Sequence, residues 1–316
     1  MDPLPDKSVR SGRAAHGRGR PVMLAVAGDS AAGKTTVTAG LVKALGRNRC
    51  VSVSSDDYQR FDREERRGKP FTPLHPDCNY FDILEQHLQL LATGQPVLKP
   101  VYDHSSGRRV HPELVEPSDF VIVHGALPLH SKLARACFDV TVFLDTAEVV
   151  RRDWKMKRDT TVRGYTTDQV SFEMRAGEAE WARFIQPQRA HADIVVRFAP
   201  IPERDDPPGT PLSAEVLLRP TIRQPDLTGI LQPDLTRTAH LRLARDTDGR
   251  PADSLHVHGY TAAEGNAAAE KLIWHALGDP RTDVPKCLGV IGPEARSTPL
   301  AITQMILLHH LLHGAR

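Results

Sequence analysis

A glycine-rich segment near the start of the sequence carries a lysine and two hydroxyl side chains at a fixed spacing. It reads Gly28-Asp29-Ser30-Ala31-Ala32-Gly33-Lys34-Thr35-Thr36 and matches the pattern G-x-x-x-x-G-K-[ST]. The glycines let backbone N–H groups approach phosphate oxygens that a Cβ atom would keep away. In such a loop the Lys34 ammonium reaches the β- and γ-phosphates, and the Thr35 hydroxyl is a ligand of Mg²⁺. The segment therefore predicts a site for a nucleoside triphosphate and Mg²⁺.

Two adjacent aspartates form the second group of candidate residues. Asp56 and Asp57 follow the β-type segment Cys50–Ser54, with only Ser55 between. Carboxylates at the end of a strand beside a phosphate loop lie where α/β sheets carry out their chemistry. One of the two would deprotonate a substrate hydroxyl, and the other would help to hold the metal. The alternative is an Asx-type turn that only caps a loop.

A cationic segment lies further along the chain. Its charged residues are Arg151, Arg152, Lys155, Lys157, Arg158 and Asp159, and a turn before Asp168 separates it from a further helix. Two basic helices over a phosphate site predict a lid whose cations neutralise the transferred phosphoryl group. A solvent-exposed, salt-bridged helical hairpin would show the same pattern.

The elements that position these residues follow from the hydrophobic pattern. Apolar segments that predict buried strands alternate with helical segments, and they cover 22–27, 119–123, 139–145 and 194–198. This alternation indicates an α/β fold with a largely parallel sheet flanked by helices, of the P-loop NTPase type. Strands at 214–218, 240–243 and 254–258 have an antiparallel rhythm, and helices are expected at 261–278 and 301–312.

We expect three parts in the chain. Residues 1–20 form a basic tail that lacks apolar periodicity and is predicted to be disordered. Residues 21–200 form the P-loop core with its lid, and residues 201–316 form a C-terminal extension of antiparallel strands and helices packed on the core. A loop rich in Pro, Asp and Gly at 199–211 marks the boundary between the last two.

Composition excludes several classes of protein. The 316 residues carry a formal net charge of +2, which gives no argument for a nucleic acid partner. No stretch has the length of a membrane span, and the start of the chain lacks the apolar region of a signal peptide. The four cysteines, Cys50, Cys78, Cys137 and Cys287, have no metal-ligand spacing and are expected to be reduced thiols in a cytoplasmic protein.

Taken together, these residues resemble the phosphoribulokinase family in its dimeric plant and cyanobacterial type, within the uridine-kinase-like branch of P-loop kinases. The resemblance runs from about residue 22 to 198 and is weak beyond. Besides the phosphate loop, it rests on Asp56-Asp57-Tyr58 with Arg63, Asn79-Tyr80-Phe81-Asp82, Lys99-Pro100-Val101-Tyr102-Asp103-His104, Lys155 with Lys157-Arg158-Asp159, Arg163-Gly164-Tyr165 and Gln186-Pro187-Gln188.

The resemblance implies a reaction in which ATP and ribulose 5-phosphate give ADP and ribulose 1,5-bisphosphate. Carried over by position, Asp56 is the base for the C1 hydroxyl. The residues that hold the substrate are Asp57, Tyr58, Arg63, Tyr102, His104 and Lys155. The residues that act on the transferred phosphoryl are Lys34, Arg158 and Arg163, and Thr35, Asp57 and Asp159 act beside Mg²⁺. The resemblance also implies a homodimer and a place in the Calvin cycle.

Three positions depart from the family pattern. The strand that ends in Glu-Gly in the family ends here in His124-Gly125, and imidazole is a poor substitute for a hard oxygen ligand to Mg²⁺. Gln59 and Leu127 stand where the family has histidines. One alternative is therefore a nucleotide-binding relative with weak or no turnover. Another is a uridine or pantothenate kinase, because those enzymes share the loop and the lid.

The cysteines that give the plant enzymes their redox control are also missing from this sequence. Their two switch cysteines align with Ala32 and Ser54 of this chain. Cys50 lies nearby in the sequence but has no evident partner for a disulfide. The sequence therefore predicts an enzyme without a thioredoxin-type switch.

Overall fold

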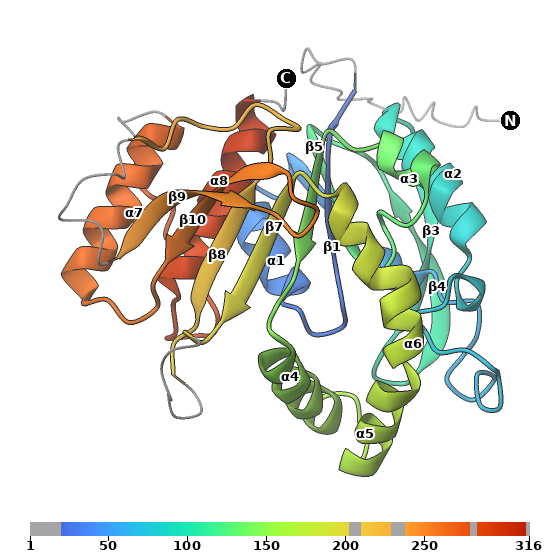
Figure 1. Cartoon of the computed structure of the whole chain (residues 1–316). Coiled ribbons are helices and arrows are strands. Elements are labelled where there is room, and N and C mark those ends of the chain that lie inside the picture. The colour runs from blue at the N-terminus through green and yellow to red at the C-terminus, as the bar shows by residue number, and fades with distance from the viewer. Residues whose placement is uncertain (1–19, 202–209, 229–237, 279–282, 314–316) are drawn as a thin grey trace, which may run out of the picture.

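The computed structural model describes residues 20–201, 210–228, 238–278 and 283–313. An eight-stranded sheet runs through these parts in the order β2-β5-β1-β6-β7-β8-β10-β9 (Figure 1). Its strands are β1 (Val22–Gly28), β2 (Cys50–Ser54), β5 (Phe120–Gly125), β6 (Val140–Leu144), β7 (Ile194–Ala199), β8 (Ser213–Leu218), β9 (Ala239–Arg245) and β10 (Pro251–Val257).

The first five strands of that order are parallel, and the last three are antiparallel. The central strands β1, β5 and β6 are almost wholly buried, as expected of a parallel sheet covered on both faces. Their carboxyl ends lie at one edge, where the loops after β1, β2 and β5 meet. The α/β fold with a largely parallel sheet and a C-terminal antiparallel extension is confirmed.

Helices cover both faces of the sheet. On one face α1 (Lys34–Leu45), α7 (Ala263–Leu277) and α8 (Thr298–His313) share a core with alternate residues of the strands. On the other face α2 (Phe81–Ala92), α3 (Lys132–Ala136) and the helical segment around Ile185 form two further clusters. That segment comprises α6 (Glu178–Glu180), a π-helical turn Trp181–Ile185 and a 3₁₀ segment Gln186–His191.

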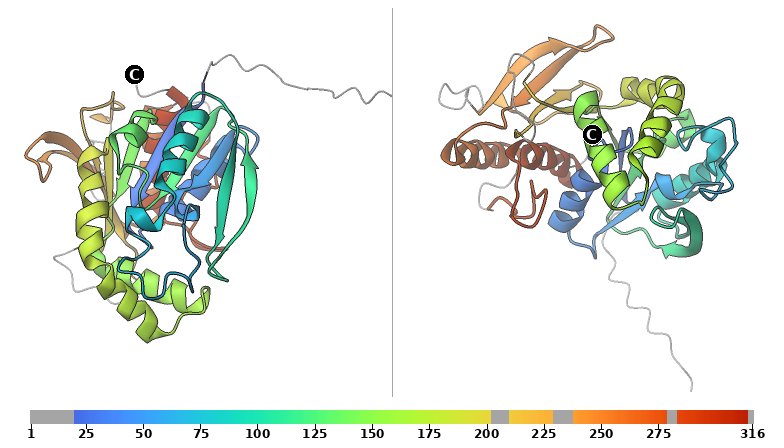
Figure 2. Two further views of the ribbon diagram at one scale, coloured as in Figure 1. Left: turned by 90° about the vertical axis from the view of Figure 1, so that its right-hand side faces the viewer. Right: turned by 90° about the horizontal axis from the view of Figure 1, so that it is seen from below.

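Two features stand apart from these layers. The strands β3 (Val97–Asp103) and β4 (Arg108–Val115) form a separate two-stranded sheet at the edge of the molecule (Figure 2). The helices α4 (Glu148–Thr161) and α5 (Thr167–Ala176) lie below the main sheet, on the side of its carboxyl edge (Figure 1). They are the two helices predicted to form a lid.

The C-terminal strands and helices are joined to the rest of the fold by buried polar contacts. Gln304 of α8 is fully buried and donates to the carbonyls of Thr36 and Val37 in the first turn of α1, at 3.2 and 3.0 Å. Its own carbonyl accepts from the Gly289 N–H at 2.7 Å. The turn that follows the phosphate loop is therefore held from the C-terminal end of the chain.

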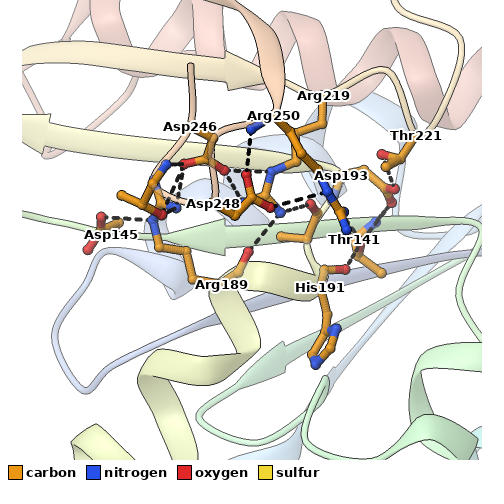
Figure 3. A network of polar contacts seen from close by, with 12 residues as sticks. Thr141, Asp145, Arg189, His191, Asp193, Arg219, Thr221, Asp246, Asp248 and Arg250 are labelled. Atoms are coloured by element: carbon orange, nitrogen blue, oxygen red, sulfur yellow. Dashed lines mark hydrogen bonds and ion pairs between the residues drawn. The ribbon is translucent and has the colours of Figure 1, made fainter. Parts of the chain in front are cut away.

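A second network lies where β7 meets β8 (Figure 3). The Arg219 guanidinium is buried, donates to the Asp246 carboxylate at 2.8 Å through Nε, and donates to the carbonyls of Ala192 and Arg189. The Arg189 side chain donates to the same carboxylate at 2.6 Å. Since each charge has a partner, the network avoids the cost of an uncompensated buried ion.

The expected strands and helices of residues 210–313 are present with bounds shifted by a few residues, as β8, β9, β10, α7 and α8. The predicted disordered tail lies outside the described residues except for Arg20, whose guanidinium pairs with Asp139 at 2.5 Å. No helix among the described residues is both long and apolar enough to cross a membrane.

Candidate active site

The phosphate loop joins β1 to α1. Gly33 has φ +94°, a left-handed conformation that favours glycine, and it caps the N-terminus of α1. The Lys34 ammonium is buried and donates to the carbonyls of Gly28 and Asp29, at 2.9 and 2.6 Å. Burial lowers the pKa of Lys34. The helix N-terminus and the lysine together form the cationic end of a cleft, suited to phosphate.

Asp56 lies on the 3₁₀ turn Ser55–Asp57 that follows β2, beside the end of β5. The Ala126 N–H donates to its Oδ1 at 2.8 Å. Gly125 makes this approach feasible, because a Cβ atom there would lie 2.8 Å from the same oxygen and 1.8 Å from Ser55 Oγ. Burial alone would raise the pKa of Asp56, but the nearby Lys34 charge and the Ala126 N–H hold it below its ordinary value. The carboxylate is therefore ionised at neutral pH and fixed in direction.

Two histidines lie beside this carboxylate. Burial lowers the pKa of His124, at the end of β5, to about 4. The pKa of His104, which follows β3, is also about 4, because burial and the Arg163 charge both oppose protonation. Both imidazoles are therefore neutral near pH 7 and can each offer a nitrogen lone pair.

The predicted lid contacts the phosphate loop directly. The Asp159 carboxylate is buried among three cations, Lys155 at 2.8 Å, Arg158 at 2.8 Å and Arg163 at 3.3 Å. Arg158 also donates to Ser30 Oγ at 2.9 Å. Arg151, near the start of α4, forms an ion pair with Asp29 at 2.8 Å. The structure therefore places Arg151 and Arg158 against the phosphate loop, and the role of the two helices as a lid stays a prediction.

Further cations lie around Arg63. The Arg63 guanidinium donates to the His104 carbonyl at 2.7 Å and lies 4.4 Å from the centre of the Tyr165 ring. Arg66 donates to the Gln59 side-chain carbonyl at 2.8 Å, so Gln59 positions a cation. Arg66, Arg67 and Lys69 also line the cleft, and they are not among the site residues predicted from the sequence.

These groups line one large cleft of about 2480 Å³. The residues of the sequence prediction that line it are Asp29–Thr36, Asp56, Arg63, Tyr102, His104, Lys155, Arg158, Asp159 and Arg163. His124 and Gln59, two of the positions that depart from the family pattern, line it as well. The C-terminal extension contributes Leu212, Asn266 and Arg296 to the same cleft, which no local pattern had indicated.

Asp57 and Tyr58 require a correction, because neither lies among the residues that line the cleft. Asp57 pairs with the buried Lys99 ammonium at 2.5 Å, on the side of β3. Tyr58 is fully buried, and its hydroxyl bonds to His87 Nδ1 at 2.9 Å. The physical reason is the 3₁₀ turn, in which successive side chains point about 120° apart. Asp56 faces the cleft, Asp57 faces Lys99 of β3, and Tyr58 faces the core.

The chain offers few donors of its own to a metal ion. Thr35 lines the cleft, while the Asp159 carboxylate is occupied by cations. No group of three or more acidic, histidine or cysteine side chains in the described ranges could hold an ion. A divalent cation that brings most of its ligands as nucleotide phosphates and water fits such a site, because Mg²⁺ in kinases is held in this way.

Comparisons with known proteins give the following matches. The sequence model of the family described as "Phosphoribulokinase / Uridine kinase family" matches residues 23–203. The phosphoribulokinase of Synechocystis is 35% identical over 181 residues, which are 57% of this chain and 54% of that protein. The uridine kinase of Halalkalibacterium halodurans is 32% identical over 183 residues, which are 56% of this chain and 86% of that protein. The chain spans about half the length of the phosphoribulokinases it matches.

Among solved structures, the phosphoribulokinase from Rhodobacter spheroides superimposes with a TM-score of 0.58. The alignment covers 79% of this chain and 94% of that one, at 18% identity. At this identity the match establishes the fold alone. It extends past the P-loop core, since the core and lid are less than 79% of the chain.

Proposed function

The chain belongs to the phosphoribulokinase/uridine kinase family, and from this premise we propose that it transfers the γ-phosphoryl group of ATP to a sugar phosphate, ribulose 5-phosphate. The observation that carries the choice of acceptor is the group of cations Arg63, Arg66, Arg67 and Lys69 along the cleft. A neutral nucleoside has no charge to compensate them. A phosphate dianion can accept several charge-assisted hydrogen bonds from an arginine fork.

The reaction proceeds by in-line transfer at the phosphate loop. The C1 hydroxyl oxygen of the acceptor attacks the γ-phosphorus, and its proton passes to the Asp56 carboxylate. The bond from that phosphorus to the β–γ bridging oxygen breaks, and ADP leaves. The direction in which Asp56 is held by the Ala126 N–H supports its role as base, since a proton acceptor must lie within hydrogen-bond reach of the hydroxyl.

The remaining residues bind and stabilise charge. Lys34, Arg158 and Arg163 compensate the negative charge that spreads over the transferred phosphoryl oxygens. Asp159 aligns Lys155, Arg158 and Arg163, because all three contact its carboxylate. Arg63, Lys155 and His104 hold the acceptor phosphate. A divalent cation bound to the nucleotide phosphates, Mg²⁺ by analogy with the family, adds further compensation of charge.

The proposal includes the assembly and location expected from the family. We propose a cytoplasmic homodimer that supplies a ribulose bisphosphate carboxylase, as in the Calvin cycle. Light scattering of the purified protein tests whether it is a dimer. A monomer at micromolar concentration would contradict it.

Two alternatives each have one observation in their favour. The 32% identity to a uridine kinase over 86% of that protein favours a nucleoside acceptor. His124, in the place of the family's metal-linked glutamate, favours a nucleotide-binding relative with weak or no turnover. Under the first, uridine is the better acceptor. Under the second, ATP binds and no ADP forms.

The test is ADP release from ATP by the purified protein, with ribulose 5-phosphate, uridine and pantothenate supplied separately. We expect turnover with ribulose 5-phosphate alone, and its loss in Asp56→Asn, which keeps the size of the side chain but removes the base. Turnover with uridine would support the nucleoside kinase. ATP binding without ADP release from any acceptor would support the relative without turnover.

A further inference from the structure

The carboxylates near the phosphate loop are mostly occupied by other charges. Asp29 pairs with Arg151, Asp57 with Lys99, and Asp159 with three lid cations. Asp56 alone among these four has no cation within ion-pair distance among the described residues, and it accepts only a backbone N–H. A metal ion carried in by a nucleotide therefore meets few free carboxylate oxygens from this chain.

His124 places an imidazole beside the phosphate loop. It is the penultimate residue of β5 and pairs in parallel register with Val26 of β1 and Ser54 of β2, so it lies at the strand ends next to the phosphate loop. Its side chain lines the same cleft as Thr35 and Asp56. In the described ranges no hydrogen bond is formed by either of its ring nitrogens. The imidazole is therefore neutral, both ring nitrogens are without a partner among the described residues, and the residue lines the part of the cleft next to the phosphate loop.

We propose that this site takes its nucleotide with a first-row transition-metal cation, Mn²⁺ or Co²⁺, in preference to Mg²⁺, with a ring nitrogen of His124 as a ligand from the protein. The inference rests on the proposed function in one respect, namely that a metal–nucleotide complex binds at the phosphate loop. It does not depend on the identity of the acceptor.

The preference follows from the chemistry of the donor. Mg²⁺ is a hard cation that favours oxygen ligands, and imidazole nitrogen is a poor ligand for it. The affinity of a nitrogen-containing site rises along the first-row series from Mn²⁺ to Co²⁺ and beyond. The phosphates and Thr35 still accept Mg²⁺, so we expect Mg²⁺ to bind more weakly rather than to be excluded.

The direct test is pulsed electron paramagnetic resonance of the Mn²⁺–ADP complex of the full chain. We expect a ¹⁴N coupling from a directly bound imidazole, lost in His124→Gln. The matched control is His104→Gln, because His104 is a second neutral imidazole in the same cleft, and the coupling should persist in that variant. Absence of the coupling in the native protein, or its loss only in His104→Gln, would overturn the assignment.

A second measurement compares affinities. We expect the ratio of Mn²⁺ to Mg²⁺ affinity, measured by titration of the ADP-bound protein, to fall about 10- to 100-fold in His124→Glu, which supplies an oxygen donor. An unchanged ratio would overturn the preference.

Neither experiment needs an acceptor or turnover. A protein that shows the nitrogen coupling but no kinase activity would refute the proposed function and leave this inference standing. Kinase activity without the nitrogen coupling would support the proposed function and refute this inference. Failure to bind Mn²⁺–ADP at all would overturn this inference, and the proposed function would then be judged by ADP release with Mg²⁺–ATP.

Discussion

Gly125→Ala tests whether the position of Asp56 determines the rate. A Cβ atom at this position would lie 1.8 Å from Ser55 Oγ and 2.8 Å from Asp56 Oδ1, whereas ordinary contacts begin at 3.4 Å. The Ser55 hydroxyl must therefore move by about 1.6 Å, and the Asp56 carboxylate oxygen by about 0.6 Å, to reach an ordinary contact. The φ of +156° adds backbone strain of about 1–3 kcal/mol.

The expected effect is on the chemical step. A misplacement of about 1 Å at a reacting group costs on the order of 100-fold in rate, so we expect kcat to fall about 100-fold. The Kd for ADP should change little, because the contacts that hold Lys34 are on β1 and the phosphate loop. The assays are ADP release with ribulose 5-phosphate, ADP titration and thermal unfolding.

The matched control is Gly94→Ala. Gly94 also has a positive φ, +81°, but a Cβ atom there would meet nothing within 4 Å. This variant should lose stability by about 1 kcal/mol through strain and keep its kcat. A native kcat in Gly125→Ala together with a lowered Tm would refute the reasoning that Asp56 must be held against Ala126. Equal losses of kcat in both variants would refute it as well.

Three further predictions follow from the structure. Arg63→Gln should raise the KM for ribulose 5-phosphate about 10- to 100-fold and leave that for ATP unchanged, since it removes charge-assisted bonds to the acceptor; an equal rise in both constants in steady-state assays would contradict this. His310 is fully buried, neither ring nitrogen has a partner among the described residues, and burial lowers its pKa from 6.5 to about 4. Its folded pKa lies below its unfolded value, so its contribution to the free energy of unfolding is complete above pH 6.5 and is lost as the pH drops towards 4. In denaturant unfolding, His310→Leu should reduce this pH dependence and stabilise the fold by about 1–3 kcal/mol. Oxidant and dithiol treatments should give equal activity, because burial raises the pKa of Cys50 to about 12 and of Cys78 to about 11 and keeps both thiols unreactive; a large reversible difference would reveal a redox switch.

Much of the site could be predicted from the sequence, because its parts are local. The phosphate loop needs a strand, a glycine segment and a helix within a short stretch, and all three are visible in the residues around Lys34. The two helices predicted to form a lid were visible for the same reason, since their charged residues recur along one helical segment. The parallel sheet followed from the alternation of buried strands and helices.

The rest depends on contacts between distant segments. Asp56 and Asp57 are equivalent in the sequence, and only the 3₁₀ turn and the position of Lys99 separate the residue that faces the cleft from the one that faces β3. The contact of Gln304 with α1 spans more than 260 residues and leaves no local pattern. Arg66 was visible as a charge, but its bond to Gln59 required the folded loop.

The measurement that tests the central claim most directly is phosphorus nuclear magnetic resonance of the reaction mixture with ATP and ribulose 5-phosphate. The account predicts that the γ-phosphate signal of ATP decays while a second phosphomonoester signal appears on the sugar, coupled to the C1 protons. The same signal should be absent with Asp56→Asn. Persistence of unchanged ATP and ribulose 5-phosphate with folded, nucleotide-binding protein would contradict the account.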